Sequence, residues 1–153
     1  MAVASIQRPI VHYPESDGQP LAESDIHCDQ LMNLRASLKE FFRAMMDVYV
    51  TGNLLLYYVE GDARRRVAPD VFVVRGVPKR DRKTYKLWEE GKGPDVVIEI
   101  TSDSTQDEDL GKKFRLYEQT LGVQESLFVR SDGRLFASAI ARLPLATGHV
   151  HGV

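Results

Sequence analysis

The stretch that decides the fold runs from Val67 to Thr101 and reads VAPDVFVVRGVPKRDRKTYKLWEEGKGPDVVIEIT. It begins and ends with short β-branched runs bounded by Gly or Pro, which is the pattern of two buried or half-buried strands. Asp70 stands at the start of the first run and Glu99 lies inside the second. Because side chains alternate along a strand, Glu99 should project from one face, and Ile98 and Ile100 from the other.

These two acids are the candidate chemistry of the chain. A carboxylate inside an apolar run is costly to bury unless it is paired with a cation or bound to a metal. Two such carboxylates, Asp70 and Glu99, on consecutive strands therefore indicate a metal site. We expect them to share one cleft, within reach of a single ion.

Upstream of this stretch, the sequence predicts an amphipathic helix. Ser24 or Asp25 can cap it, and apolar residues then recur at intervals of three and four: Leu31, Leu34, Leu38, Phe41, Phe42 and Met45. On the helical wheel Glu40 lies away from this stripe, whereas His27 lies near its centre. His27 or Glu23 is thus better placed than Glu40 to join a site, although a histidine at the start of a helix is more often structural.

The residues between that helix and Asp70 predict a hairpin. Leu54–Val59 has the composition of a strand, ends at Glu60, and is followed by a Gly61-Asp62 turn signal. The next strand carries Asp70, so the two should pair antiparallel. Glu60 is then a candidate third acid by proximity, and a solvated charge at a strand end is the alternative.

Residues 75–86 form a basic stretch with six basic side chains and a single acid, Asp81. The aromatic residues Tyr85 and Trp88 lie beside them. Basic side chains with nearby aromatics suit phosphate contact and base stacking. The alternative is a solvated loop whose aromatic side chains pack on the core.

A second amphipathic helix follows the Glu99 strand. A capping box at Ser104 or Thr105 can start it and Gly122 can end it, and its apolar stripe is Leu110, Phe114, Tyr117 and Leu121. Lys113 falls at the border of this stripe, whereas Lys112 lies nearly opposite. Only Lys113 can therefore point back toward the sheet, although it could also drape its stem over the helix edge.

At 153 residues, the chain is predicted to form a single domain over 1–153. Its longest apolar run is far shorter than the roughly 20 residues that span a membrane. Residues 1–10 lack the features of a secretory signal, and the only cysteine, Cys28, permits no intrachain disulfide. We therefore expect a cytoplasmic protein with no membrane partner. The net charge of −2 argues against a uniformly basic nucleic-acid binder, but local patches can still contact phosphates.

Several motifs, in order and at their spacings, resemble one known family: Pro69-Asp70, Glu99-x-Thr101, Asp109-x-x-x-Lys113-x-x-x-Tyr117 and Gly122-Val123. The family is that of the "Uma-type putative restriction endonucleases", abundant in cyanobacteria and part of the PD-(D/E)XK nuclease superfamily. The resemblance covers about residues 13–125, and includes Asp17-Gly18, Ser24-Asp25-x-His27, Gly52-Asn53-Leu54 and Arg75-Gly76-Val77-Pro78. Beyond Glu125 the chain departs from the pattern, which predicts an atypical tail over 126–153, as a shifted or shortened reading frame would produce.

The resemblance implies an α/β fold with a restriction-endonuclease-like core, in which helices flank a central mixed β-sheet. It also implies Mg²⁺-dependent hydrolysis of DNA, with Mn²⁺ able to substitute. Asp70, Glu99 and the backbone carbonyl of Ile100 would hold the metal, and Lys113 would act on the attacking water. The usual superfamily lysine lies two residues after the glutamate, where this chain has Thr101, and the family pattern moves it to Lys113.

Thr101 and Tyr117 would be supporting positions, and Tyr117 could equally belong to the core. A homodimer would suit cleavage of two strands. The main alternative is a noncatalytic DNA-binding or scaffold protein that retains the nuclease fold. A small-molecule hydrolase lacks support, because no Ser-His-acid or Cys-His arrangement is apparent and Cys28 fits a small apolar packing residue.

Overall fold

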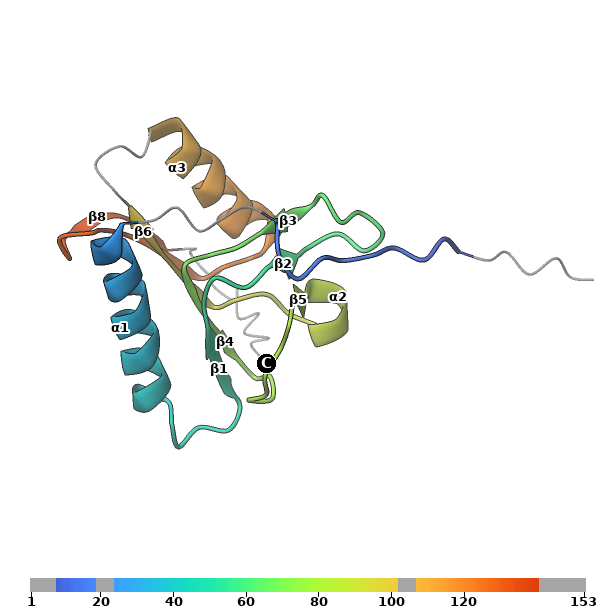
Figure 1. Cartoon of the computed structure of the whole chain (residues 1–153), viewed down its shortest axis with the longest axis horizontal. Helices are drawn as coiled ribbons and strands as arrows, with labels where there is room; N and C mark the ends of the chain where they lie inside the picture. Colours follow the sequence, from blue (N-terminus) through green and yellow to red (C-terminus); the bar gives the residue numbers. More distant parts are fainter. Residues whose placement is uncertain (1–7, 19–23, 102–106, 141–153) are drawn as a thin grey trace, which may run out of the picture.

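A five-stranded mixed sheet forms the centre of the computed structural model, which describes residues 8–18, 24–101 and 107–140 (Figure 1). The strand order is β1-β4-β6-β7-β8, and only the β6–β7 pair is parallel among the neighbouring pairs. The strands are β1 (Val48–Thr51), β4 (Val71–Arg75), β6 (Val96–Thr101), β7 (Glu125–Arg130) and β8 (Leu135–Ile140).

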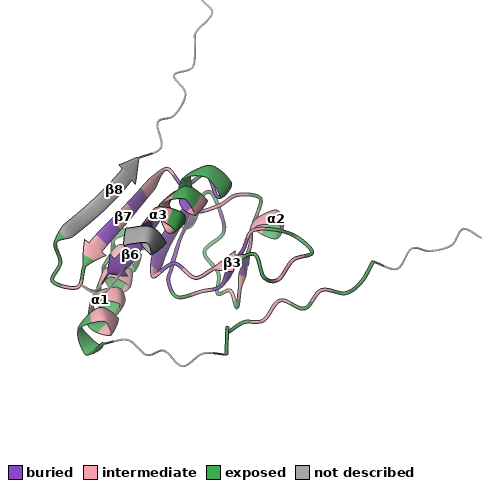
Figure 2. Ribbon diagram, turned by 90° about the horizontal axis from the view of Figure 1, so that it is seen from above, coloured by how far each residue is buried: buried purple, intermediate pink, exposed green. Residues whose placement is uncertain are grey.

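Helices cover both faces of this sheet, as predicted (Figures 1 and 2). On one face lies α1 (Asp25–Phe41), and Leu38 and Phe42 at its end pack against a cluster of Val48, Val50 and Val73. On the other face lie α3 (Asp107–Arg115) and the π-helical turn η1 (Leu116–Thr120). Their apolar side chains enter the main core together with Val97 and Phe128. The alternation of side chains along β6 thus sends its odd-numbered residues toward α3.

The predicted hairpin between Leu54–Val59 and the Asp70 strand is wrong. Instead, β4 pairs antiparallel with β6 on one side and with β1 on the other. The Val-Tyr-Val-Thr run of β1 is buried throughout and shows no alternation. The chain leaves that sheet after Thr51 and forms β2 (Leu56–Tyr57) in a second sheet. That sheet has the order β3-β2-β5, with β3 at Arg66–Val67 and β5 at Tyr85–Lys86.

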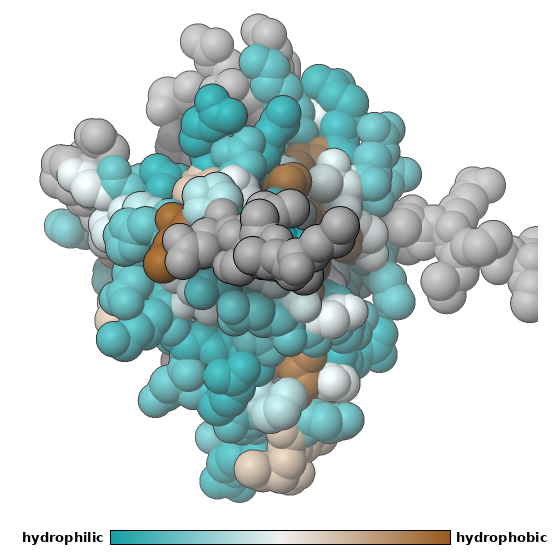
Figure 3. Space-filling model, turned by 90° about the vertical axis from the view of Figure 1, so that its right-hand side faces the viewer, coloured by the Kyte–Doolittle hydropathy of each residue, from teal (hydrophilic) through white to brown (hydrophobic). Residues whose placement is uncertain are grey.

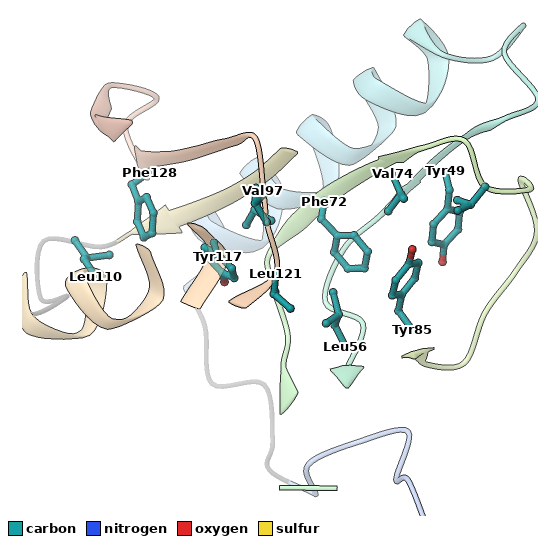
Figure 4. Close-up of a cluster of buried hydrophobic side chains, with 12 residues drawn as sticks. Tyr49, Leu56, Phe72, Val74, Tyr85, Val97, Leu110, Tyr117, Leu121 and Phe128 are labelled. Carbon is teal, nitrogen blue, oxygen red and sulfur yellow. The ribbon is translucent and has the colours of Figure 1, made fainter. Parts of the chain in front are cut away.

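The main core lies between the large sheet, α3 with η1, and the small sheet (Figure 4). The largest fully buried side chains among the described residues are aromatic, namely Tyr57, Tyr85, Tyr117, Phe72 and Phe128. Tyr85 packs edge-on against Phe72, and the short helix α2 (Leu87–Glu90) follows directly after β5. The second sheet is therefore joined to the first by aromatic packing.

The helix boundaries follow from local chemistry. The Ser24 hydroxyl accepts a hydrogen bond from the His27 amide, which is the predicted N-cap of α1. This helix ends at Phe41, whose side chain is 78% exposed, so the apolar stripe is shorter than predicted. Gly122, with φ of 63°, ends η1 as expected. The capping boxes at Ser104 and Thr105 lie outside the described residues.

The strands β7 and β8 pair antiparallel and form a hairpin at the edge of the large sheet. The face of the molecule around α2 and the small sheet is largely hydrophilic, with only scattered apolar groups (Figure 3). Over the described part of the chain, no helix combines the length and apolar character that crossing a bilayer requires.

Candidate active site

Asp70 and Glu99 meet at one end of the β4–β6 pair. Val71 pairs with Ile98, and continuing this antiparallel register by one residue places Asp70 opposite Glu99. The Ile100 amide donates a 2.7 Å hydrogen bond to the Asp70 carboxylate. The two carboxyl groups lie within hydrogen-bonding reach of each other. The structure thus brings together the two acids that strand phase and motif singled out.

Two side chains from the following helical segment hold Glu99. The Lys113 ammonium lies 3.3 Å from Oε2 of Glu99, and the Tyr117 hydroxyl donates a hydrogen bond to Oε1. Glu99 is only 3% exposed and Tyr117 is fully buried. The prediction that Lys113 points back toward the sheet is confirmed, and Lys112 is exposed.

A π-helical turn sets the position of Tyr117. The Leu121 amide donates to the Leu116 carbonyl at 3.1 Å, five residues back, where an α-helix would bond four residues back. Such turns occur often at functional sites. Burial raises the pKa of Tyr117, as does the charge of Glu99. The Tyr117 hydroxyl therefore keeps its proton and acts as a donor.

The pKa of Glu99 is raised above its ordinary value. Burial raises its pKa to about 7, and the neighbouring Asp70 charge also raises it, against the opposing effects of Lys113 and Tyr117. Two carboxylates this close cannot both be ionised without cost. A cation between them would remove that cost, so the pair suits a metal ion.

His27, in the first turn of α1, also reaches this end of the sheet. Its Nε2 lies 3.6 Å from Oδ1 of Asp70, and both side chains are largely buried. The helical wheel therefore placed His27 on the correct side. Glu40 is exposed beside Arg43, as the same argument predicted.

Among the described residues, the structure adds no third acid to the pair. Glu60 is exposed and lines a surface hollow with Arg8, Tyr13 and Trp88, a hollow that includes neither Asp70 nor Glu99. Glu23 lies outside the described residues. Within the ranges that the structure describes, no group of three or more His, Cys, Asp or Glu residues is arranged to hold a metal.

A divalent ion fits the groups that are present when a backbone oxygen is counted. The N–H and C=O of one residue point to the same side of a strand, and the Ile100 N–H points at Asp70. The Ile100 carbonyl therefore faces the acids as well. Two carboxylates and a carbonyl are oxygen ligands, and Mg²⁺ commonly keeps several waters in the remaining positions.

In the basic stretch, the structure favours the alternative of a loop that packs on the core. Arg80 and Arg82 both bind Glu90 at 2.8 to 3.1 Å, and Arg82 also stacks over the Tyr49 ring at 4.2 Å. Tyr85 is fully buried. The contacts of Arg80 and Arg82 with Glu90 therefore stabilise the loop.

One feature of the site escaped sequence reasoning. The amide of Ile100 anchors Asp70, although the sequence pointed only to the carbonyl of that residue. The available signal was the strand register, which could not be known before the partner of each strand was known.

The mixed sheet with helices on both faces is the α/β architecture that the sequence predicted, and Asp70 and Glu99 lie side by side at one end of its β4–β6 pair. The chain belongs to the Uma2 family, described as "Putative restriction endonuclease", whose family model matches residues 3–138. This range is wider than the motif resemblance over 13–125 and includes β7 and most of β8.

A solved structure supports the same fold. It is titled as a putative nuclease belonging to DUF820 from Anabaena variabilis ATCC 29413, and matches with a TM-score of 0.55 and 15% sequence identity. The match covers 80% of this chain and 73% of that chain. At this identity the likeness shows the fold alone. The search of curated proteins gave no match.

Proposed function

We propose that this protein is a Mg²⁺-dependent DNA endonuclease that hydrolyses phosphodiester bonds, with Asp70, Glu99 and Lys113 as its catalytic residues. One observation carries the proposal: two acids within hydrogen-bonding reach of each other, one of them buried with its pKa raised to about 7, share a site with Lys113. The family to which the chain belongs, and the fold that it shares with a protein titled as a putative nuclease, support a nucleic acid as the substrate.

Each residue has a separate task in this proposal. Asp70, Glu99 and the Ile100 carbonyl would hold the ion, and the Ile100 amide would fix the Asp70 carboxylate. Bound Mg²⁺ would polarise a phosphoryl oxygen and activate a water. Tyr117 would keep Glu99 oriented through its hydrogen bond. The Lys113 ammonium, 42% exposed, reaches from Glu99 toward solvent and would stabilise the charge that develops at phosphorus.

The test is nicking of supercoiled plasmid with Mg²⁺ or Mn²⁺ by the wild type, Lys113→Ala and Lys112→Ala at matched folded fractions. Removing one electrostatic donor typically lowers turnover by about a hundredfold or more, so Lys113→Ala should show at most about 1% of wild-type cleavage. Lys112→Ala is the matched control, because it removes the neighbouring positive charge, which lies about 100° around the helix from Lys113. Equal activity of the wild type and Lys113→Ala would reject the catalytic role of Lys113. Inactivity of all three proteins would favour the noncatalytic DNA-binding alternative.

A further inference from the structure

The chain makes an unusually close approach to Asp70 at the end of β1. After Thr51 the chain bends at Gly52 and Asn53, directly over Pro69 and Asp70. A Cβ atom on Gly52 would lie 2.1 Å from the Asp70 carbonyl oxygen and 3.1 Å from its carbonyl carbon. Cβ contacts under 3.0 Å are essentially never observed. Only glycine fits at this position, for reasons of space.

The bend is also fixed by hydrogen bonding and backbone conformation. The Asn53 amide donates a 2.9 Å hydrogen bond to the Pro69 carbonyl, and Asn53 has φ of 51°. Asparagine tolerates this left-handed conformation better than most residues. Gly52 and Pro69 are both buried. The bend therefore lies directly against the backbone of Asp70, on the β1 side.

On its other side, Asp70 is held by β6. Its carboxylate accepts the Ile100 amide from β6, at 2.7 Å. The atom that a Gly52 side chain would strike is backbone, so no side-chain rotation could relieve the clash. A substitution at Gly52 must push Asp70 away from β1, and the distance to the Ile100 amide must change with it.

We propose that Gly52 is a positioning residue for Asp70: the absence of its side chain lets β1 hold the Asp70 backbone where its carboxylate meets Ile100 and Glu99. The consequence for metal binding rests on the proposed function. The consequence for the Ile100 amide does not, because that hydrogen bond exists without a metal. A displacement of about 1 Å at such a group can cost about a hundredfold in rate.

The chain offers a matched control in Gly93. A Cβ there would lie 2.7 Å from the Leu121 carbonyl oxygen, which is also backbone, and it would also touch Leu87. Gly93 lies before β6, at the end of the sheet remote from Glu99. Gly52→Ala and Gly93→Ala should both lower stability, but only Gly52→Ala should disturb the site.

The experiment has two readouts on full-length wild type, Gly52→Ala and Gly93→Ala. The first is amide hydrogen exchange by NMR without metal, for Ile100 relative to Asp95, whose amide donates to Val73 in the same sheet at 2.8 Å. In Gly52→Ala the Ile100 amide should exchange at least about tenfold faster relative to Asp95. In Gly93→Ala this ratio should not increase.

The second readout is Mn²⁺ affinity from the EPR signal of free Mn²⁺. Gly52→Ala should weaken binding by about 10- to 100-fold, the usual effect of disturbing a group that orients a ligand, and Gly93→Ala should stay within about twofold of wild type. An unchanged Ile100 exchange ratio in folded Gly52→Ala overturns the positioning role. If the wild type binds no Mn²⁺, the proposed function fails, and the exchange ratio still decides the role of Gly52.

Should Gly52→Ala fail to fold, Asn53→Ala and Asn53→Gly provide the decision. Alanine disfavours the left-handed conformation, whereas glycine accepts it. Asn53→Ala should therefore speed Ile100 exchange about threefold relative to Asp95, and Asn53→Gly should not. Equal ratios in both variants would overturn the proposal.

Discussion

Two Pro-Asp dipeptides lie in this chain, and they differ only in what surrounds them. Pro69-Asp70 precedes β4 and Pro94-Asp95 precedes β6. Each aspartate accepts a hydrogen bond from a backbone amide: Asp70 from Ile100 at 2.7 Å and Asp95 from Arg75 at 2.6 Å. In local sequence and in backbone contacts, the two acids are near equivalents.

The two aspartates differ in the charged side chains around them. Both oxygens of Asp95 also meet the Lys92 ammonium, at 2.9 and 3.2 Å, so this buried acid is balanced by a cation. Asp70 instead faces the carboxyl group of Glu99, and the pKa of Glu99 is raised to about 7 by burial, with Asp70 adding to the effect. A buried acid that meets enough donors stabilises the fold. A buried acid that meets another acid marks the candidate site.

The sharpest test of this contrast is to truncate both aspartates. Asp70→Ala and Asp95→Ala each leave one amide without its acceptor, which typically costs about 2 kcal/mol of unfolding free energy. Only Asp70→Ala removes a proposed metal ligand, whose catalytic contribution of several kcal/mol corresponds to about a thousandfold in rate. Plasmid nicking at matched folded fractions measures the rate, and urea unfolding in EDTA measures the stability. Comparable cleavage by both variants would contradict the claim that Asp70 belongs to the active site and Asp95 only to the fold.

The next test uses the pH dependence of stability without metal. The pKa of Glu99 is about 7 in the folded state against an ordinary value of 4.5, so the folded state binds this proton more tightly than the unfolded state. The resulting stabilisation is fully present below pH 4.5 and is lost as pH rises to 7, an effect of about 3 kcal/mol. Urea unfolding in EDTA between pH 4.5 and 8 should show this loss in the wild type. Glu99→Gln should lack it, and parallel pH profiles would contradict the assignment.

Local pattern predicted much of the fold. The α1 and α3 stripes, the Ser24 cap, the Gly122 stop and the strands β4 and β6 follow from periodicity and from the chemistry of helix ends. The strand β1 could not be found in this way, because four fully buried residues show no alternation. The second sheet is harder still, since β2 and β5 contain two residues each and pair in parallel across a long stretch of sequence.

The candidate site likewise contains features that local pattern predicted and features that it could not predict. Helical phase alone chose Lys113 over Lys112, and strand phase placed Glu99 on the face opposite to Ile98 and Ile100, because both depend on a single element. The strand runs selected Asp70 together with Glu99, but the contrast between Asp70 and Asp95 depends on strand register and could not be predicted from local pattern. The position of His27 near Asp70 and the fit of Gly52 against the Asp70 backbone likewise depend on packing between distant segments.

The smallest expected effect compares two buried tyrosines, one at each end of β6. The Tyr117 hydroxyl donates to Glu99, and the Tyr85 hydroxyl donates to the Lys92 carbonyl at 2.7 Å. Both rings are fully buried, so Tyr117→Phe and Tyr85→Phe should each lower stability by about 1 kcal/mol. The hydrogen bond from Tyr117 lowers the pKa of Glu99, so its loss raises that pKa further.

Mn²⁺ has to displace the proton on Glu99, so a higher pKa of Glu99 moves Mn²⁺ binding to higher pH. The pH of half-maximal Mn²⁺ binding should therefore move upward in Tyr117→Phe and stay at the wild-type value in Tyr85→Phe. EPR titration of free Mn²⁺ across pH measures both. Equal shifts in the two variants would mean that the tyrosines affect the site only through global stability. A shift confined to Tyr117→Phe would show that the π-helical turn tunes the acid, because the turn is what places that hydroxyl on Glu99.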